Sequence, residues 1–106
     1  MRVDVDAPTA ATVKALAEPV RWRIVELLAT DELCVCHLVE ELDIPQPLVS
    51  HHLKVLRDAG LVESERFRYW TYYRLRPEPF ARAGRALTGI AERAPVRGGE
   101  RRRPCC

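Results

Sequence analysis

The spacing of apolar residues in this chain changes at Gly60, and that change constrains the fold more than any other feature. Before Gly60, apolar side chains recur at helical spacing, as at Ile24 and Leu28. After it they alternate over residues 61–66 and 69–75, and the second of these runs is rich in aromatic residues. The first spacing is typical of amphipathic helices and the second of strands, so the sequence predicts helices followed by a β-hairpin.

Prolines, a glycine and polar capping residues divide the chain into five predicted helices. Asp31 is expected to cap the third helix, and Gly60 to follow the end of the fourth in the left-handed conformation. The helices are expected at residues 8–17, 20–28, about 31–42, 46–59 and 77–94. The predicted fold class is therefore mainly α with a β-hairpin (α+β): a winged helix-turn-helix with five helices and a two-stranded wing.

The fourth predicted helix separates polar from apolar side chains when its residues are placed at about 100° each. Gln46 on the polar arc can pair with adenine in the major groove, whereas Ser50 and Lys54 can contact base edges and phosphates. The predicted DNA-binding residues are Gln46, Pro47, Ser50, His51 and Lys54 in this helix, and Arg66 and Arg68 at the hairpin tip. Leu48 and His52 fall on the opposite arc, where we expect them to pack inward.

The size of the chain fits one domain. Its 106 residues, 47% of them apolar, can fill one modest core, and a homodimer would bury further surface. We expect residues 1–94 to form the DNA-binding and dimerisation domain and residues 95–106 to form a disordered tail. No secretory leader is visible and no apolar run approaches the roughly 18 residues of a membrane span, so a cytoplasmic location without membrane contact is predicted.

Three stretches of the chain resemble one protein family. They are Glu32-Leu33-Cys34-Val35-Cys36, the run from Gln46 to Val62, and Tyr72-Tyr73-Arg74-Leu75. Over about residues 8–92 the chain is similar to the ArsR/SmtB family of metal-responsive winged-helix repressors. The resemblance implies a homodimer, formed through the first and last helices, that binds double-stranded operator DNA and releases it when a metal or metalloid binds. In the hairpin turn, where the family often has glycine, this chain has Arg68-Tyr69-Trp70.

Cys34 and Cys36 are the candidate metal ligands, in the first turn of the predicted third helix. Thiolates suit arsenite, antimonite, cadmium and lead, and the N-terminus of a helix lowers the pKa of a thiol. Side chains two residues apart on a helix point about 200° apart. We therefore expect joint binding of one ion by both sulfurs to unwind this turn, to move the fourth helix and to lower the affinity for DNA.

A third sulfur is missing beside this pair. Members of the family that respond to arsenite usually have a further cysteine at the place of Val39, and His37 is interpreted as a surface residue. Cys105 and Cys106 are the candidate additional ligands. If at most one of them binds the ion together with Cys34 and Cys36, three-coordinate arsenite or antimonite is favoured, and these are the predicted inducers. If both bind, cadmium or lead is favoured. No organic cofactor is expected.

Three alternative functions follow from other uses of the same residue types: a redox switch, a zinc sensor and an enzyme. In a thiol redox switch, Cys34 and Cys36 or the tail pair would oxidise to disulfides. Residues 77–94 contain no His or Asp, so the zinc site that the family places on its last helix is not expected. An enzyme is not expected either, because the spacing is Cys-x-Cys, not Cys-x-x-Cys, and no βαβ pattern surrounds it.

Overall fold

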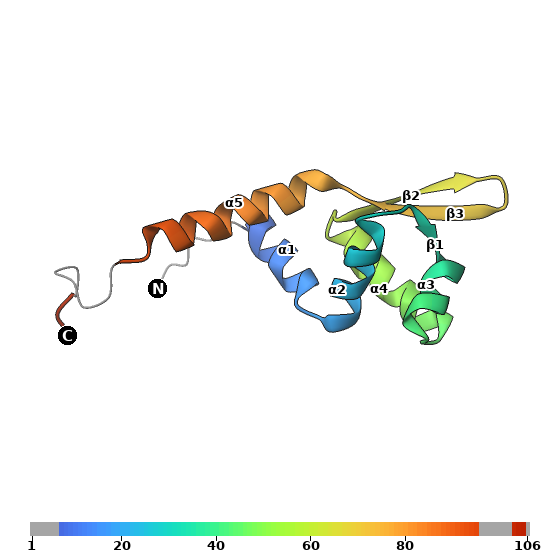
Figure 1. Cartoon of the computed structure of the whole chain (residues 1–106), viewed down its shortest axis with the longest axis horizontal. Helices are drawn as coiled ribbons and strands as arrows, with labels where there is room; N and C mark the ends of the chain where they lie inside the picture. Colours follow the sequence, from blue (N-terminus) through green and yellow to red (C-terminus); the bar gives the residue numbers. More distant parts are fainter. Residues whose placement is uncertain (1–6, 96–102, 106) are drawn as a thin grey trace.

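The computed structural model describes residues 7–95 and 103–105 of the chain. Its elements are α1 (Ala7–Leu16), α2 (Pro19–Leu28), β1 (Leu33–Cys34), α3 (Val35–Leu42), α4 (Gln46–Asp58), β2 (Val62–Phe67), β3 (Trp70–Leu75) and α5 (Pro77–Arg93). The predicted winged helix-turn-helix is confirmed, with α3 and α4 as the helix-turn-helix and β2–β3 as the wing (Figure 1). The expected tail from residue 95 lies largely outside the described residues.

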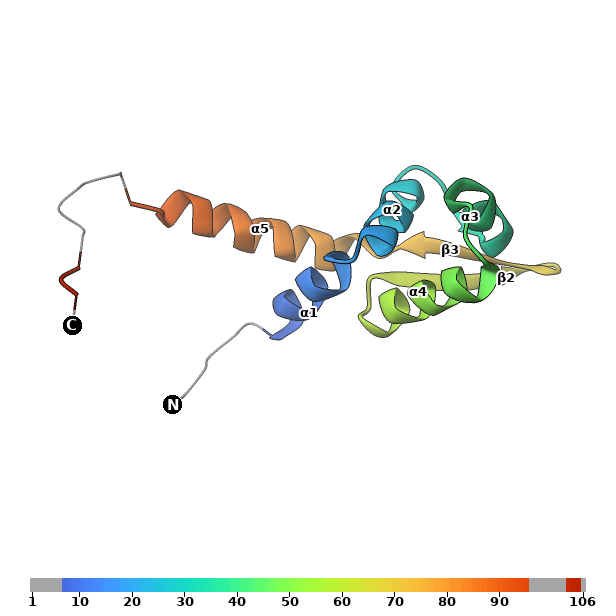
Figure 2. The same cartoon turned by 90° about the horizontal axis from the view of Figure 1, so that it is seen from below.

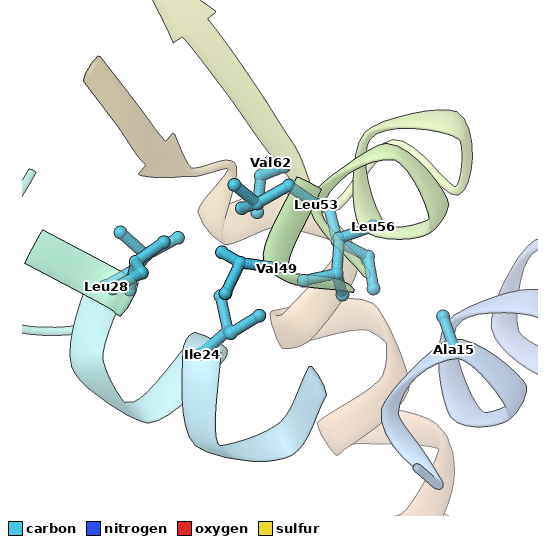
Figure 3. Packing of buried hydrophobic residues seen from close by; sticks show 9 residues of the cluster. Ala15, Ile24, Leu28, Val49, Leu53, Leu56 and Val62 are labelled. Carbon is cyan, nitrogen blue, oxygen red and sulfur yellow. The ribbon is translucent and has the colours of Figure 1, made fainter. Parts of the chain in front are cut away.

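A small apolar core holds α2, α3 and α4 against the sheet. Ile24, Leu38 and Val49 are fully buried, and Val62 of β2 is nearly so. Figure 3 shows Ile24, Val49 and Val62 converging from α2, α4 and β2. Burial of each such side chain stabilises the fold by about 1.5–3 kcal/mol relative to exposure. The core therefore fixes the orientation of α4 relative to the rest of the domain.

Gly60 ends α4 as the sequence predicts. Its φ of 77° lies in the left-handed region, which glycine enters without the steric penalty of a Cβ atom. The N–H of Gly60 donates to the carbonyl of Arg57 at 2.9 Å, and the N–H of Leu61 donates to that of Leu56 at 3.0 Å. This pair of bonds is the Schellman arrangement, and it turns the chain directly from α4 into β2.

The sheet has one strand more than the predicted two-stranded wing. Its order is β1-β3-β2, and both pairings are antiparallel. In β1, Leu33 and Cys34 pair with Tyr73 and Tyr72 of β3. The expected N-cap at Asp31 is wrong, because this pairing keeps the backbone extended as far as Cys34, and α3 begins only after it. A strand of two residues is too short to show alternation in the sequence.

Helix α5 leaves the body of the domain and runs beside α1 (Figures 1 and 2). Ala83 is the one buried residue of α5. Beyond it Leu87 and Ile90 are exposed, at 56% and 58% of their surface. The apolar stripe of α5 is therefore only partly covered in a single chain. Among the described residues, no helix has both the length and the apolar character needed to cross a membrane.

Candidate functional site

The two thiols of the Cys-x-Cys motif lie side by side. Cys34 is the N-cap of α3, with an extended backbone (φ −95°, ψ 170°), and its Sγ atom lies 3.0 Å from that of Cys36. The expected divergence of about 200° is therefore wrong, because only Cys36 lies within the helix. Both sulfurs can reach one ion without unwinding α3. Cys34 is buried and Cys36 exposed, so an ion would approach from the side of Cys36.

His37 is half-buried and completes a cluster with the two thiols, which differs from its interpretation as a surface residue. Its Nδ1 atom lies 3.3 Å from the Sγ atom of Cys34 and accepts a hydrogen bond from the backbone N–H of Cys34 at 3.2 Å. The ligand atoms of Cys34, Cys36 and His37 all lie within 4.8 Å of one another. The sequence signal is the spacing of three between Cys34 and His37, which is that of an N-cap and N3 pair.

The pKa of Cys36 is shifted in the direction opposite to the one expected. The neighbouring Cys34 side chain, through its hydrogen bond, is the main reason that the pKa of the Cys36 thiol is raised above its ordinary value. The expected lowering by the helix N-terminus is therefore wrong for Cys36. Because thiolates are the metal-binding form, binding at Cys36 would displace a proton that the neighbouring sulfur helps to retain.

Of the two tail cysteines, the structure describes only Cys105, which does not join this cluster in a single chain. Cys105 is an exposed, free cysteine, and the cluster found in the described residues holds only Cys34, Cys36 and His37. Cys106 lies outside the described residues. A contribution of the tail to the metal site therefore remains a prediction.

The thiol cluster is joined directly to the wing. Cys34 pairs with Tyr72 of β3, and the rings of His37 and Tyr72 have centroids 6.5 Å apart. A hollow of about 320 Å³ opens beside the thiols between the start of α3 and the wing. It is lined by Cys34, Val35, Cys36, Tyr69, Trp70 and Thr71. A ligand on the sulfurs would thus contact both elements.

Arg74 of β3 is linked by charge to β2 and to the residue before β1. Its Nε donates to Glu63 at 2.8 Å, and its Nη1 donates to Glu65 at 2.9 Å and reaches Glu32 at 3.5 Å. The carboxylates of Glu65 and Glu63 raise the pKa of Arg74 above its usual range. Exposed ion pairs stabilise weakly one at a time, but this network ties the segment before β1 to the wing hairpin.

The face of α4 that the sequence assigns to DNA is open to solvent. Its exposed residues include Gln46, Pro47, Ser50, His51 and Lys54. Lys54 donates to Asp58 at 2.8 Å, and this bond lowers the pKa of Asp58. Leu48 was expected to pack inward, but 42% of its surface is exposed because it lies at the edge of the buried stripe formed by Val49, Leu53 and Leu56.

The wing ends in a two-residue turn, Arg68–Tyr69, between β2 and β3. Arg68 has a φ of 59°, whereas Tyr69 is not in the positive-φ region, which is the pattern of a type II′ turn. The guanidinium of Arg68 lies 5.5 Å from the centroid of the Phe67 ring. Arg66 and Arg68 are both exposed, so the tip presents two cations without the glycine that this turn type favours.

Arg68→Gly should stabilise the fold. Glycine takes a positive φ without the penalty of about 1 kcal/mol that a Cβ atom brings, so the free energy of unfolding should rise by up to that amount. Urea denaturation measures it. Arg66→Gly is the matched control, since it removes the same side chain from a strand position and should lower stability by about 0.5–1 kcal/mol. Equal effects of the two substitutions would contradict the strain at Arg68.

His52 is a structural residue of α4, as predicted. It is 7% exposed, and its Nδ1 atom lies 3.2 Å from Nη1 of Arg21 and 3.5 Å from the carboxylate of Glu18. Burial is the main cause that lowers the pKa of His52, although Glu18 opposes it. Burial would raise the pKa of Glu18, but hydrogen bonds from the N–H groups of Arg21 and Val20 and the nearby His52 lower it. These contacts join the start of α2 to α4.

The lowered pKa of His52 predicts a pH-dependent stability. At a pH between the lowered pKa of His52 in the folded chain and its value of about 6.5 in the unfolded chain, the unfolded chain binds more protons than the folded one. Stability should therefore fall as the pH drops below about 6.5. The pKa of Glu18 is also lowered, so Glu18 should change the stability in a separate pH range, below about pH 4.5. Urea denaturation from pH 7.5 to 5 should show a shallower dependence for His52→Gln than for the wild type. His51→Gln, which removes the exposed neighbour, is the matched control; a slope unaltered by His52→Gln would contradict the assignment.

The comparison with known proteins agrees with this architecture. Residues 18–64 match the model of the bacterial regulatory protein, arsR family. A homodimeric winged helix-turn-helix DNA-binding domain from Mycobacterium bovis superposes with a TM-score of 0.67 and 30% identity, covering 87% of this chain and 91% of that one. The chain belongs to the ArsR family. This is a family of regulatory proteins and not of enzymes, as expected.

Curated relatives of this ArsR-family chain include an arsenic resistance regulator and a further transcriptional repressor. The arsenic resistance transcriptional regulator ArsR1 of Pseudomonas putida is 41% identical over 74% of this chain and 62% of its own length. The HTH-type transcriptional repressor SmtB of Mycobacterium tuberculosis is 51% identical over 59% of this chain. The chain spans 62% and 47% of the lengths of these two relatives.

Proposed function

We propose that this protein is a DNA-binding transcriptional repressor that releases its operator when arsenite or antimonite binds Cys34 and Cys36. The observation that carries the proposal is the contact of 3.0 Å between the two sulfurs, at the junction of the wing and the helix-turn-helix. The names of relatives such as ArsR1 of Pseudomonas putida support the same inducer class. Its place of action is the cytoplasm, where a bacterial operator lies.

The DNA-binding surface combines α4 and the wing tip. Gln46, Ser50 and His51 would meet base edges in the major groove, while Pro47 lies at the start of the same helix. Lys54 would exchange its exposed ion pair with Asp58 for a phosphate, because such a pair is worth less than about 1 kcal/mol. Arg66 and Arg68 extend from the wing and would reach flanking phosphates or the minor groove.

The active form is a homodimer through α1 and α5. Val13, Trp22, Leu87 and Ile90 are between 44% and 58% exposed, an unusual amount of apolar surface for two packed helices and the start of α2. A hollow of about 230 Å³ lined by Val13, Leu16, Ala17, Trp22, Ala83 and Leu87 lies among them. The related M. bovis domain is homodimeric. Two copies related by a two-fold axis would present two α4 helices to successive half-sites.

Inducer binding would act by a shift at the junction, and not by the unwinding that the sequence suggested. Cys34 is tied to β3 through its pairing with Tyr72, whereas Cys36 moves with α3. An ion bound to both sulfurs replaces their direct contact and therefore repositions α3 relative to the wing. Because α3 packs on α4, the reading helix and the wing would no longer match one DNA surface.

Cadmium or lead is the second candidate for the inducer, and His37 is the observation that favours it. Its Nδ1 atom lies 3.3 Å from the sulfur of Cys34, so the site offers a nitrogen donor besides two thiolates. Imidazole and thiolate together suit borderline divalent ions, and a tail sulfur would provide a fourth ligand. Arsenite in contrast prefers sulfur and leaves His37 unused.

The test is a gel-shift titration of the full chain on its own promoter DNA with arsenite, antimonite, cadmium, lead and zinc under reducing conditions. Release by arsenite and antimonite at the lowest concentrations supports the first candidate. Release by cadmium or lead that is lost in His37→Ala supports the second. Retention of DNA with every ion, followed by release under an oxidant, would replace both with the thiol redox switch. A protein that does not bind the promoter would contradict the repressor itself.

A further inference from the structure

The tip of the wing carries an aromatic surface that the fold of a single chain leaves open. Phe67 and Trp70 are 54% and 51% exposed, and Tyr69, in the turn itself, is 86% exposed. The rings of Tyr69 and Trp70 meet edge to face, with centroids 6.1 Å apart. Large apolar side chains gathered at one exposed point of a protein mark a surface that contacts something else.

A second copy of the chain does not account for this surface. The wing projects from the body at the end of the molecule opposite to α5 (Figures 1 and 2). The proposed dimer forms through α1 and α5, so its interface lies far from the wing tip. The three aromatic rings therefore stay exposed in the dimer, and their partner is another molecule.

The charges around the rings point to a nucleic acid as that partner. Arginine and aromatic residues alternate at the tip in the run Arg66-Phe67-Arg68-Tyr69-Trp70, and residues 66–77 contain no Asp or Glu. Within the described chain, Arg66 donates to the carbonyl of Arg68 and Arg68 lies over the Phe67 ring, so no carboxylate neutralises either cation there. The wing also continues the DNA-binding surface that begins with α4. Phosphates would meet the two arginines, and bases offer flat faces to the rings.

We propose that Tyr69 is a wedge that enters the minor groove beside the α4 contact and stacks on a base at a loosened step. Phe67 and Trp70, which are cross-strand partners at the base of the turn, would cover the adjacent sugars. This inference rests on the proposed role of the wing in DNA binding. Side chains inserted in this way kink DNA by about 20–90° toward the major groove, which is where α4 would lie. The protein therefore bends its operator, and the arginines alone do not.

The wedge would give a sequence preference at positions that α4 does not touch. Pyrimidine–purine steps such as TA and CA unstack most readily, whereas A-tracts are stiff. Replacing the flexible step beneath each wing by an A-tract should therefore lower the affinity of the wild type about tenfold. The same replacement should have little effect on Tyr69→Ala, because that variant no longer distorts the step.

The experiment measures the bend and the affinity of the full chain on its own promoter DNA without inducer. Circularly permuted fragments of one length give the bend angle from their gel mobility at saturating protein, so a weaker variant is compared at full occupancy. Tyr69→Ala should lose most of the bend and bind about tenfold more weakly. Tyr69→Phe, which keeps the ring, should retain the bend and the affinity.

Arg66→Gln is the matched control, because it alters another exposed residue of the same tip and leaves the rings in place. It should reduce the slope of log K against log salt by about 0.9 for each wing and should keep the bend. 2-Aminopurine placed at the flanking steps reports unstacking directly. Its fluorescence should rise on binding of the wild type and of Arg66→Gln, but not of Tyr69→Ala.

Three results would overturn the inference: a wild-type complex whose DNA is unbent, a Tyr69→Ala complex with the wild-type bend, or loss of the bend in Arg66→Gln to the same degree as in Tyr69→Ala. Failure of the proposed function gives different results. A wild-type chain that does not bind the promoter would remove the repressor and the wedge together. Bent DNA that stays bound when arsenite saturates the protein would contradict the inducer and leave the wedge supported.

Discussion

Cys36→Ser is expected to keep the affinity for DNA and to lose the response to arsenite. Cys36 is exposed, so the substitution removes a ligand without leaving a cavity in the core. Two adjacent sulfurs bind one ion as a chelate, in which the second bond forms within the molecule and adds about 10²–10⁴ in affinity. The arsenite concentration that releases half of the DNA should therefore rise at least about 100-fold, measured by fluorescence anisotropy with a labelled operator.

Cys105→Ser is the matched control, since it exchanges sulfur for oxygen at another exposed cysteine. An unchanged arsenite response would place sensing at the Cys34–Cys36 pair, and a response weakened about tenfold or more would bring the tail into the site. Cys34→Ser is less informative alone, because Cys34 is buried and its loss also affects packing. A Cys36→Ser protein that releases DNA at the wild-type arsenite concentration would contradict the two-sulfur site.

Leu87→Glu is expected to separate the dimer into single chains. Leu87 lies on the uncovered side of α5 and lines the apolar hollow shared with α1 and α2. In an interface with a two-fold axis the new carboxylate would be buried twice without a partner, which costs several kcal/mol. The dissociation constant of the dimer should rise at least about 100-fold, as measured by sedimentation equilibrium.

Arg85→Gln is the matched control for this experiment. It also lowers the net charge by one, but at about 200° from Leu87 around the helix, and Arg85 is exposed. This variant should remain a dimer. Leu87→Glu should also lose operator affinity, because a single chain reaches one half-site. If Leu87→Glu sediments as the wild type does, α5 is not part of the interface.

The helices could be predicted because their signals are local. Pro19, Pro77 and Gly60 begin or end helices through backbone conformations that depend on the residue itself. The inward position of His52 followed from the same periodicity as that of Val49 and Leu53. Its contacts with Glu18 and Arg21 could not be predicted in this way, because α2 and α4 are brought together only by the core.

The sequence by itself determined the order of helices, the wing hairpin, the exposed polar face of α4 and the close spacing of the two thiols in the chain, because each depends on spacing within one segment. Only the tertiary structure decided how those thiols are arranged. Pairing of Leu33 and Cys34 with a strand far along the chain holds Cys34 outside the helix. That contact brings the sulfurs together, places His37 beside them and opens the hollow toward Trp70, none of which a local pattern encodes.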